Sequence, residues 1–292
     1  MAGTEILLRV QDYDLAATLD SGQVFRWREQ NGSWIGVVGK HWVRLTQTRD
    51  GIRAESAASV ENWDWLRKFL QIDWDLSAVL KTFPDDAPMR AAAKACHGLR
   101  VLRQDPWECL ASFILSSNKQ IAQIRQIISL LCERFGEPCS VEPMARLSSA
   151  AGRTLQFSFP TPQRIAAATD SELRACKMGF RAPHLLATAR QVAAGNFDLE
   201  RPRHLPLAEA RAELMKLPGV GGKIANCVLL FAYGFDAAFP VDVWVERALR
   251  KLYFPHRRVT PKRLRHFAAT HFGPYAGYAQ QYLFHYMRTK MK

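Results

Sequence analysis

The sequence predicts an α+β fold that is mostly α, with an N-terminal antiparallel β-sheet followed by a helical domain. Short β-favouring runs separated by turn dipeptides extend to about residue 55, and apolar residues recur at helical spacing from about residue 87 onward. The chain has 292 residues, 48% of them hydrophobic, so it is long enough to bury a large core. We expect residues 1–96 to form the β-containing domain and residues 97–292 the helical domain.

Three short runs near the N-terminus favour β-strands, namely Val24–Trp27, Trp34–Val38 and Trp42–Thr46. The dipeptides Asn31-Gly32 and Asp50-Gly51 lie between such runs, and both tolerate the positive φ angles that tight hairpins need. We therefore expect an antiparallel meander.

Helical spacing predicts most of the remaining elements. Residues 56–80 return to this spacing, and residues 106–132 form one long stretch of apolar positions with a period of 3.6. No internal repeat at the period of a solenoid is present. Further helices are expected at 141–150, 163–168, 171–177, 184–194, 207–217, 223–233, 243–252, 261–270 and 278–287.

The charge is strongly positive and unevenly distributed. The formal net charge is +13, and no Asp or Glu follows Glu246. A polyphosphate partner such as DNA would exploit this surplus, because each phosphate that a cation neutralises releases condensed counterions. Binding to an anionic membrane surface, or solubility alone, are the alternatives that charge leaves open.

The cysteines point away from metal ligation and disulfides. Six are scattered with no CxxC pair, which gives no support for zinc or iron–sulfur binding. The N-terminal MAGTEILLRV lacks the apolar run of a signal peptide or membrane anchor. We expect an intracellular, reduced, soluble protein. The six cysteines are at positions 96, 109, 132, 139, 176 and 227.

The string LPGVGGK at 217–223 predicts a turn between two helices, which gives a helix–hairpin–helix. Gly219 and Gly221 permit a tight turn and let the backbone approach another molecule closely. The N–H groups at the start of the second helix would form a seat for a phosphate that ignores base identity. A plain turn between helices is the alternative, and DNA binding is the interpretation we favour.

Lys223 lies in the first turn of that second helix, where the helix dipole disfavours a cation. The dipole and burial would both lower the pKa of the amine, and a neutral amine is a carbon nucleophile that can form a Schiff base. Cys227 shares its helix face, and Asp242 is placed to N-cap the helix over 243–252. Spacing alone leaves open that Lys223 is only solvated and Asp242 only caps.

The chain resembles the 8-oxoguanine DNA glycosylase family, within the helix–hairpin–helix glycosylases that carry a Gly/Pro-rich loop and an aspartate. The resemblance covers nearly the whole length, and several separated motifs occur in the family's order. It implies a bifunctional DNA glycosylase/AP lyase that acts on 8-oxoguanine in double-stranded DNA, as a monomer. The motifs are LPGVGGK followed by PVD, LDSGQVFRWREQNGSW (19–34), LRVLRQDPWECLASFILSSN (99–118), KMGFRAPHL (177–185) and YAGYAQQYLF (275–284).

By this resemblance Lys223 is the amine that attacks the sugar C1′ and expels the damaged base. Asp242 would stabilise the positive charge that develops on the sugar, because glycosidic cleavage passes through an oxocarbenium-like state. The covalent imine then permits β-elimination, which nicks the strand 3′ to the lesion.

The resemblance also assigns a pocket for the extruded base. Cys227 and Phe284 match the cysteine and phenylalanine that sandwich the purine. Gln280 matches the glutamine that bonds the Watson–Crick edge of the base. Gly22 matches the glycine whose carbonyl accepts the N7–H that distinguishes 8-oxoguanine from guanine.

Four positions match residues that face the orphaned cytosine. Asn118 matches the asparagine that fills the gap, Phe180 replaces a tyrosine wedge, and Arg181 matches an arginine directed at the cytosine. Gln123 departs from the family, in which many relatives have an arginine. Losing a charged hydrogen bond is worth roughly 1.5–3 kcal/mol, so we expect weaker discrimination among opposite bases.

A second departure is Trp244, where relatives have a histidine that commonly pairs with an acid at the position of Met287. We expect packing to replace that polar contact.

No cysteine follows Cys227, so the four-cysteine iron–sulfur loop of other branches is absent and no cofactor is expected. The competing hypotheses are a non-catalytic DNA-binding module, a glycosylase for alkylated purines, and a structural helical scaffold.

Overall fold

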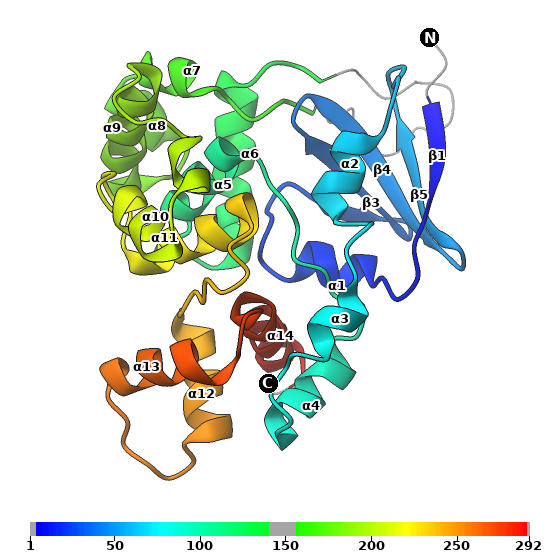
Figure 1. Ribbon diagram of the computed structural model, residues 1–292. Helices are drawn as coiled ribbons and strands as arrows, with labels where there is room; N and C mark the ends of the chain where they lie inside the picture. Colours follow the sequence, from blue (N-terminus) through cyan, green and yellow to red (C-terminus); the bar gives the residue numbers. More distant parts are fainter. Residues whose placement is uncertain (1–3, 140–155, 291–292) are drawn as a thin grey trace. The chain divides into compact units, whose positions relative to one another are not determined.

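The N-terminal part forms a five-stranded antiparallel sheet, and the remainder is mostly helical (Figure 1). The computed structural model describes residues 4–139 and 156–290. Across the sheet the order is β1-β5-β4-β3-β2, so β2 to β5 form the expected meander and β1 pairs with β5. The predicted fold class is confirmed. The strands are β1 (Thr4–Arg9), β2 (Arg28–Gln30), β3 (Ser33–Val38), β4 (His41–Thr48) and β5 (Gly51–Ser56).

Turn residues with positive φ connect the strands of the meander. Asn31 and Gly32, with φ of 52° and 76°, join β2 to β3 in the two-residue hairpin that the sequence predicts. At the second predicted hairpin Gly51 opens β5 with φ of 145°, and a Cβ there would lie 2.1 Å from the Leu8 carbonyl oxygen. A third hairpin, between β3 and β4, turns at Gly39, which the sequence analysis missed.

The prediction of a strand at Val24–Trp27 is wrong, and β1 was missed. The segment has no strand conformation, and its large side chains are buried instead. The Trp27 ring stacks on Phe69 at 5.9 Å, and the Phe25 ring meets Phe113 edge-on at 5.7 Å. These residues look β-favouring because they are large and apolar, but their side chains fill the core while their backbone joins no sheet.

The predicted single stretch over 106–132 is two helices, α5 (Pro106–Leu115) and α6 (Ile121–Phe135). The Ser116 and Ser117 hydroxyls donate back to the Phe113 and Ile114 carbonyls at 2.7 and 3.3 Å, which competes with the helical ladder. Asn118 then adopts φ of 52°, so the chain leaves the helix. Apolar periodicity continues across the break because both helices bury the same kind of face.

The predicted stretch over 56–80 is also two short helices, separated at Gln71, which has φ of 53°. The helix expected at 141–150 lies outside the described residues. The helices predicted from residue 163 onward are found in the predicted order, whereas α1, η1 and η2 were not predicted. The bounds are α1 (Leu15–Asp20), α2 (Asp64–Leu70), α3 (Leu76–Leu80), α4 (Ala87–Ala95), α7 (Pro162–Ala166), α8 (Asp170–Ala175), η1 (Gly179–Arg181), α9 (Ala182–Ala193), η2 (Arg201–His204), α10 (Leu207–Leu214), α11 (Gly222–Val228), η3 (Leu229–Tyr233, a π-helix), α12 (Val243–Tyr253), α13 (Pro261–His271) and α14 (Ala276–Thr289).

The chain packs into two compact units that interleave along the sequence. The first comprises Met1–Gln11, Val24–Ile72 and Ala111–Leu199, and it contains the whole sheet. The second comprises Asp12–Gln23, Asp73–Leu110 and Glu200–Lys292, and it contains the hairpin of α10 and α11. The predicted boundary between residues 96 and 97 divides the chain in sequence order, and it stays a prediction.

Candidate active site

The helix–hairpin–helix is formed by α10, a turn at Pro218–Gly221, and α11. Gly219 has φ of 77°, which suits a glycine in a tight turn. Gly221 is the extended N-cap residue, and the first bond of the helical ladder runs from the Ala225 N–H to its carbonyl at 2.9 Å. A Cβ added at Gly221 or Gly222 meets nothing within 4 Å, so the start of α11 faces open space.

The Asn226 side chain braces this hairpin from inside the second unit. Its Oδ1 accepts a bond from Arg211 Nε of α10 at 2.9 Å, and its Nδ2 donates to the Phe239 carbonyl at 3.2 Å. One amide thus ties both helices of the hairpin to the segment that leads into Asp242. The sequence analysis missed this residue, because an isolated polar position in a helix carries no signal of its tertiary partners.

Asp242 caps α12, as the sequence predicts. Its Oδ1 accepts the Val245 N–H at 2.8 Å. Burial raises the pKa of this carboxyl above its ordinary value, and the Val245 N–H and the positive charge of Lys223 oppose that shift. Lys223 is half-buried in the first turn of α11, and the fold places its charge close enough to affect Asp242.

Cys227 lies one turn further along α11 and is 3% exposed. Burial raises the pKa of its thiol to about 11, with Lys223 lowering the value and Asp242 raising it. The thiol is therefore neutral at physiological pH and is neither a nucleophile nor a metal ligand in that state. It offers a small apolar surface beside the two charged groups.

Helix α14 approaches the same region of the second unit closely through Gly277. Its N–H donates to the Asp236 carbonyl at 2.7 Å, and a Cβ at this position would lie 2.3 Å from Leu230 Cδ1. Three positions one turn apart then follow along one face of α14: Gln280, Phe284 and Arg288. Gln280 is 4% exposed, and its Oε1 is buried without a hydrogen-bond partner in the described part of the chain.

Arg288 links this helix face to the segment that precedes Gly22. Its guanidinium carbon lies 5.6 Å from the centroid of the half-buried Phe284 ring. It also donates to the Asp20 carbonyl at 3.2 Å and lies 3.7 Å from the Asp20 carboxylate. The sequence analysis missed Arg288, which holds one of the predicted base-binding residues against the end of α1.

The loop containing Gly22 is held by buried amides. The Ser21 carbonyl accepts from Gln281 Nε2 at 2.9 Å, and the Gln23 carbonyl accepts from Gln104 Nε2 at 2.7 Å. The Gln23 side chain itself makes four further bonds, of 2.8 to 3.0 Å. Gly22 has φ of 77°, and its carbonyl accepts no hydrogen bond from any residue within 4–139 or 156–290. The carbonyls on either side of it, those of Ser21 and Gln23, are both occupied.

The first unit brings together three of the four residues predicted to face cytosine. Arg181 is 4% exposed, and its guanidinium donates to the carbonyls of Ser117 and Met178, at 2.7 Å from Nε and 3.1 Å from Nη1. It also lies 4.2 Å from the centroid of the Phe180 ring, which is 55% exposed. Arg181 thus fastens the turn that carries the exposed Asn118 to the exposed Phe180. A direct contact between Arg181 and cytosine stays a prediction.

Gln123, the fourth of these residues, belongs to a capping box at the start of α6. Its Oε1 accepts the Gln120 N–H at 3.2 Å, and the Gln120 side chain caps the Gln123 N–H in return. Gln123 is exposed.

Trp244 and Met287 have different environments. Met287 is 2% exposed, which agrees with packing at that position. Trp244 is half-buried and lies beneath Arg247, whose guanidinium carbon is 5.0 Å from the ring centroid.

The described residues contain no group of three or more His, Cys, Asp or Glu side chains placed to hold a metal ion. None of the described helices is long and apolar enough to cross a membrane.

Comparison with known proteins identifies the family and supports the fold. Residues 5–110 match the model of the 8-oxoguanine DNA glycosylase N-terminal domain, and residues 111–273 match that of the HhH-GPD superfamily base excision DNA repair proteins. The N-glycosylase/DNA lyase OGG1 of Arabidopsis thaliana is 32% identical, over 92% of this chain and 76% of the relative. A probable N-glycosylase/DNA lyase of Methanothermobacter thermautotrophicus is 28% identical, over 96% and 95% respectively.

Among solved structures, the 8-oxoguanine glycosylase/lyase of Clostridium acetobutylicum, bound to double-stranded DNA with cytosine opposite 8-oxoguanine, superposes with a TM-score of 0.87. It is 30% identical, and the match covers 98% of this chain and 99% of that one. The fold and the hairpin site define a base excision repair protein of the HhH-GPD superfamily. Within that superfamily the chain belongs to the 8-oxoguanine DNA glycosylase family, and it is a DNA glycosylase with lyase activity.

Proposed function

We propose that this enzyme excises 8-oxoguanine from duplex DNA and then nicks the strand, with Lys223 as nucleophile and Asp242 as electrostatic partner. The observation that supports the proposal is that Lys223 lies in the first turn of α11 and Asp242 caps α12, close enough for the charge of Lys223 to lower the pKa of the Asp242 carboxyl. The relatives named above as N-glycosylase/DNA lyases, and the Clostridium enzyme bound to 8-oxoguanine DNA, support the same substrate.

The reaction requires the damaged nucleotide to leave the duplex so that its C1′ can reach the amine. Lys223 Nζ forms a bond to C1′ as the C1′–N9 bond breaks, and the base leaves with the electron pair and is then protonated. Positive charge develops on the sugar, and the Asp242 carboxylate is complementary to it. Opening of the sugar ring gives an imine, loss of a C2′ proton follows, and the 3′ phosphate departs.

Selection of 8-oxoguanine rests on two acceptors in the second unit. The Gly22 carbonyl suits the N7–H donor, which 8-oxoguanine has and guanine lacks. The buried Oε1 of Gln280 suits the N–H donors on the Watson–Crick edge of the base. Cys227 and Phe284 supply apolar surface for the purine faces, since the thiol of Cys227 is neutral. We infer that these four groups recognise the flipped base.

Borohydride trapping tests this proposal. Wild-type protein incubated with a labelled 8-oxoguanine duplex and borohydride should give a covalent protein–DNA adduct, and Lys223→Gln should give none. A duplex with guanine in place of 8-oxoguanine, and one with an alkylated purine, serve as controls. An equal yield of adduct on all three duplexes would contradict the selectivity. Absence of an adduct with the wild-type protein would contradict the assignment of Lys223 as the nucleophile.

We further propose that the protein acts as an intracellular monomer without a resident cofactor, because an amine nucleophile needs neither metal nor redox chemistry. A chelator should therefore leave the excision rate unchanged. Sedimentation at increasing protein concentration should show a constant mass.

A further inference from the structure

An open groove lies along α12 and the loop that follows it, outside the residues assigned to the base. Its volume is about 860 Å³, and its lining runs from Val243 to Arg258. Five of the ten lining residues are lysine or arginine: Arg247, Arg250, Lys251, Arg257 and Arg258. One carboxylate, Glu246, lines it as well.

Most of this positive charge is unbalanced. Glu246 is already engaged by Arg250, with 2.8 Å between its Oε1 and the guanidinium. Within 4–139 and 156–290 no carboxylate lies within ion-pair distance of Lys251, Arg257 or Arg258. All three side chains belong to exposed residues. Positive charges gathered on one concave surface repel one another, so such a surface favours the binding of an anion that spans several of them.

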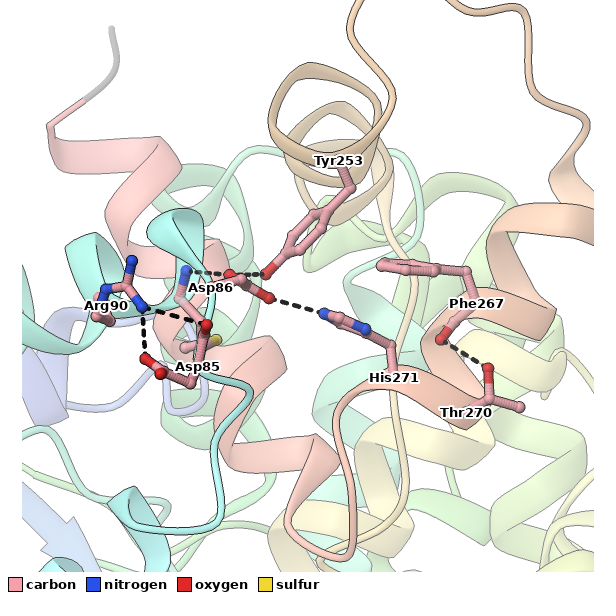
Figure 2. Close-up of polar contacts among 8 residues, drawn as sticks. Asp85, Asp86, Arg90, Tyr253, Phe267, Thr270 and His271 are labelled. Carbon is pink, nitrogen blue, oxygen red and sulfur yellow. Dashed lines mark hydrogen bonds and ion pairs between the residues drawn. The ribbon is translucent and has the colours of Figure 1, made fainter.

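The groove is held in place by a half-buried polar junction at its far end (Figure 2). Asp86 Oδ1 caps α4 through the Met89 N–H at 2.8 Å and also accepts from the Tyr253 hydroxyl at 3.2 Å. Asp86 Oδ2 lies 2.8 Å from His271 Nε2 of α13. Tyr253 is the last residue of α12 and precedes Phe254 in the groove lining. The junction therefore fixes the C-terminal end of α12, and with it the loop that carries Arg257 and Arg258.

The near end of the groove adjoins the candidate active site. Val243, the first lining residue, directly follows Asp242 and is 72% exposed, although it is an apolar side chain. Next along α12, Arg247 is oriented by stacking on Trp244. The unpaired cations thus begin beside the catalytic aspartate and continue away from it along α12.

We propose that this groove, which we call the α12 groove, binds the sugar–phosphate backbone of the duplex on one side of the damaged nucleotide. It would extend the DNA contact by several phosphates beyond those next to the lesion. The inference rests on the proposed function, because only a substrate bound at Lys223 and Asp242 brings duplex DNA to the start of the groove. Phosphate contacts of this kind position the duplex without reading its sequence.

The test compares two variants that each lose three positive charges. Lys251→Gln/Arg257→Gln/Arg258→Gln removes three unpaired cations of the groove and leaves Arg247 on Trp244. The matched control, Arg9→Gln/Lys40→Gln/Arg49→Gln, removes exposed cations from the strands and hairpins of the sheet. Binding is measured by anisotropy at several salt concentrations. Three duplexes with a reduced abasic site are used: one long on both sides of it, one shortened on the 5′ side and one shortened on the 3′ side.

On the long duplex we expect the groove variant to bind more weakly and with a shallower salt dependence. Each lost phosphate contact lowers the slope of log K against log salt by roughly 0.9. When the salt concentration rises fourfold, the affinity of the wild type should therefore fall by a factor about 40 times larger than that of a variant that has lost three contacts. Shortening one side, and not the other, should remove the difference between the two proteins.

Three results would overturn the inference. The first is a groove variant that binds like the control variant on every duplex. The second is an equal loss on both shortened duplexes, which would indicate a general effect of charge. The third is a loss of binding to phosphatidylserine vesicles with no loss on DNA, which would assign the groove to a membrane surface. Borohydride trapping by the wild-type protein separates these outcomes, because it tests Lys223 independently of the groove.

Discussion

Asp242 is expected to have two separable functions, as a helix cap and as a charge, and two substitutions distinguish them. In the wild-type protein Asp242 Oδ1 accepts the Val245 N–H at 2.8 Å. Asp242→Asn keeps a side-chain oxygen that can accept this bond but removes the negative charge. Asp242→Ala removes both. Losing an N-cap costs about 1 kcal/mol, so the alanine variant should melt roughly 2–4 °C below the asparagine variant.

The sign of the charge effect on stability follows from the pKa shift. Burial raises the pKa of Asp242, so the protonated form is favoured in the folded state. The stability that this carboxyl contributes is present below its unfolded pKa of about 3.9 and is lost as pH rises through the higher folded pKa. Above the folded pKa, a neutral amide avoids the cost of ionisation. Asp242→Asn should therefore be at least as stable as wild type at neutral pH, with no such advantage near pH 3.9.

The rate of base excision should fall in Asp242→Asn, although its stability does not. Removing one group that stabilises transition-state charge costs about 100- to 1,000-fold in rate, so both variants should be slow in single-turnover excision. Calorimetry gives the melting temperature of each variant, and single-turnover kinetics on the same preparations give its excision rate. The reasoning fails if the asparagine variant melts as low as the alanine variant, or if it excises the base at the wild-type rate.

Three further expectations concern other positions. Wild-type protein, with Gln123 in a capping box instead of a charged donor, should excise 8-oxoguanine opposite cytosine and opposite adenine at similar single-turnover rates, and a large cytosine preference would contradict this. Asp86→Ala should lower the free energy of unfolding by about 2–3 kcal/mol in denaturant titration, because it removes three hydrogen bonds, including those to Tyr253 and His271, whereas Asp86→Asn should lose less. With a pKa of about 11, Cys227 is ionised in about one molecule in a thousand at pH 8, so peptide mapping should find it unlabelled by iodoacetamide when an added cysteine-containing reference peptide is fully labelled.

Residues whose effect is local were predictable from the sequence. Asn31-Gly32 sets positive φ angles by its own chemistry, and the hairpin is found where the dipeptide stands. Gly219, with its positive φ, likewise specifies the turn before α11, whereas Gly221 is extended there. Asp242 caps the helix that follows it, because an N-cap bond reaches only three residues ahead. The order of the helices followed from apolar periodicity for the same reason.

Residues that act through distant partners needed the tertiary structure. Asn226 braces the hairpin only because folding brings Arg211 and Phe239 to either side of it. The loop at Gly22 is fixed by Gln104 and Gln281, which are far away in sequence. Sequence patterns report the backbone and burial preference of each segment, whereas such contacts depend on where several segments meet.

The sequence by itself determined the fold class, the hairpin, the N-cap at Asp242 and the excess of positive charge after Glu246. The tertiary structure alone decided which of those charges stay unpaired. The pair between Arg250 and Glu246 is a local contact one turn apart within α12, which helical spacing already indicates. That Lys251, Arg257 and Arg258 line one groove, with no carboxylate of the described residues at ion-pair distance, depends on how α12 and the loop after it pack. The physical reason is that charge pairing depends on distances of a few ångströms between side chains, which only the packing of helices and loops sets.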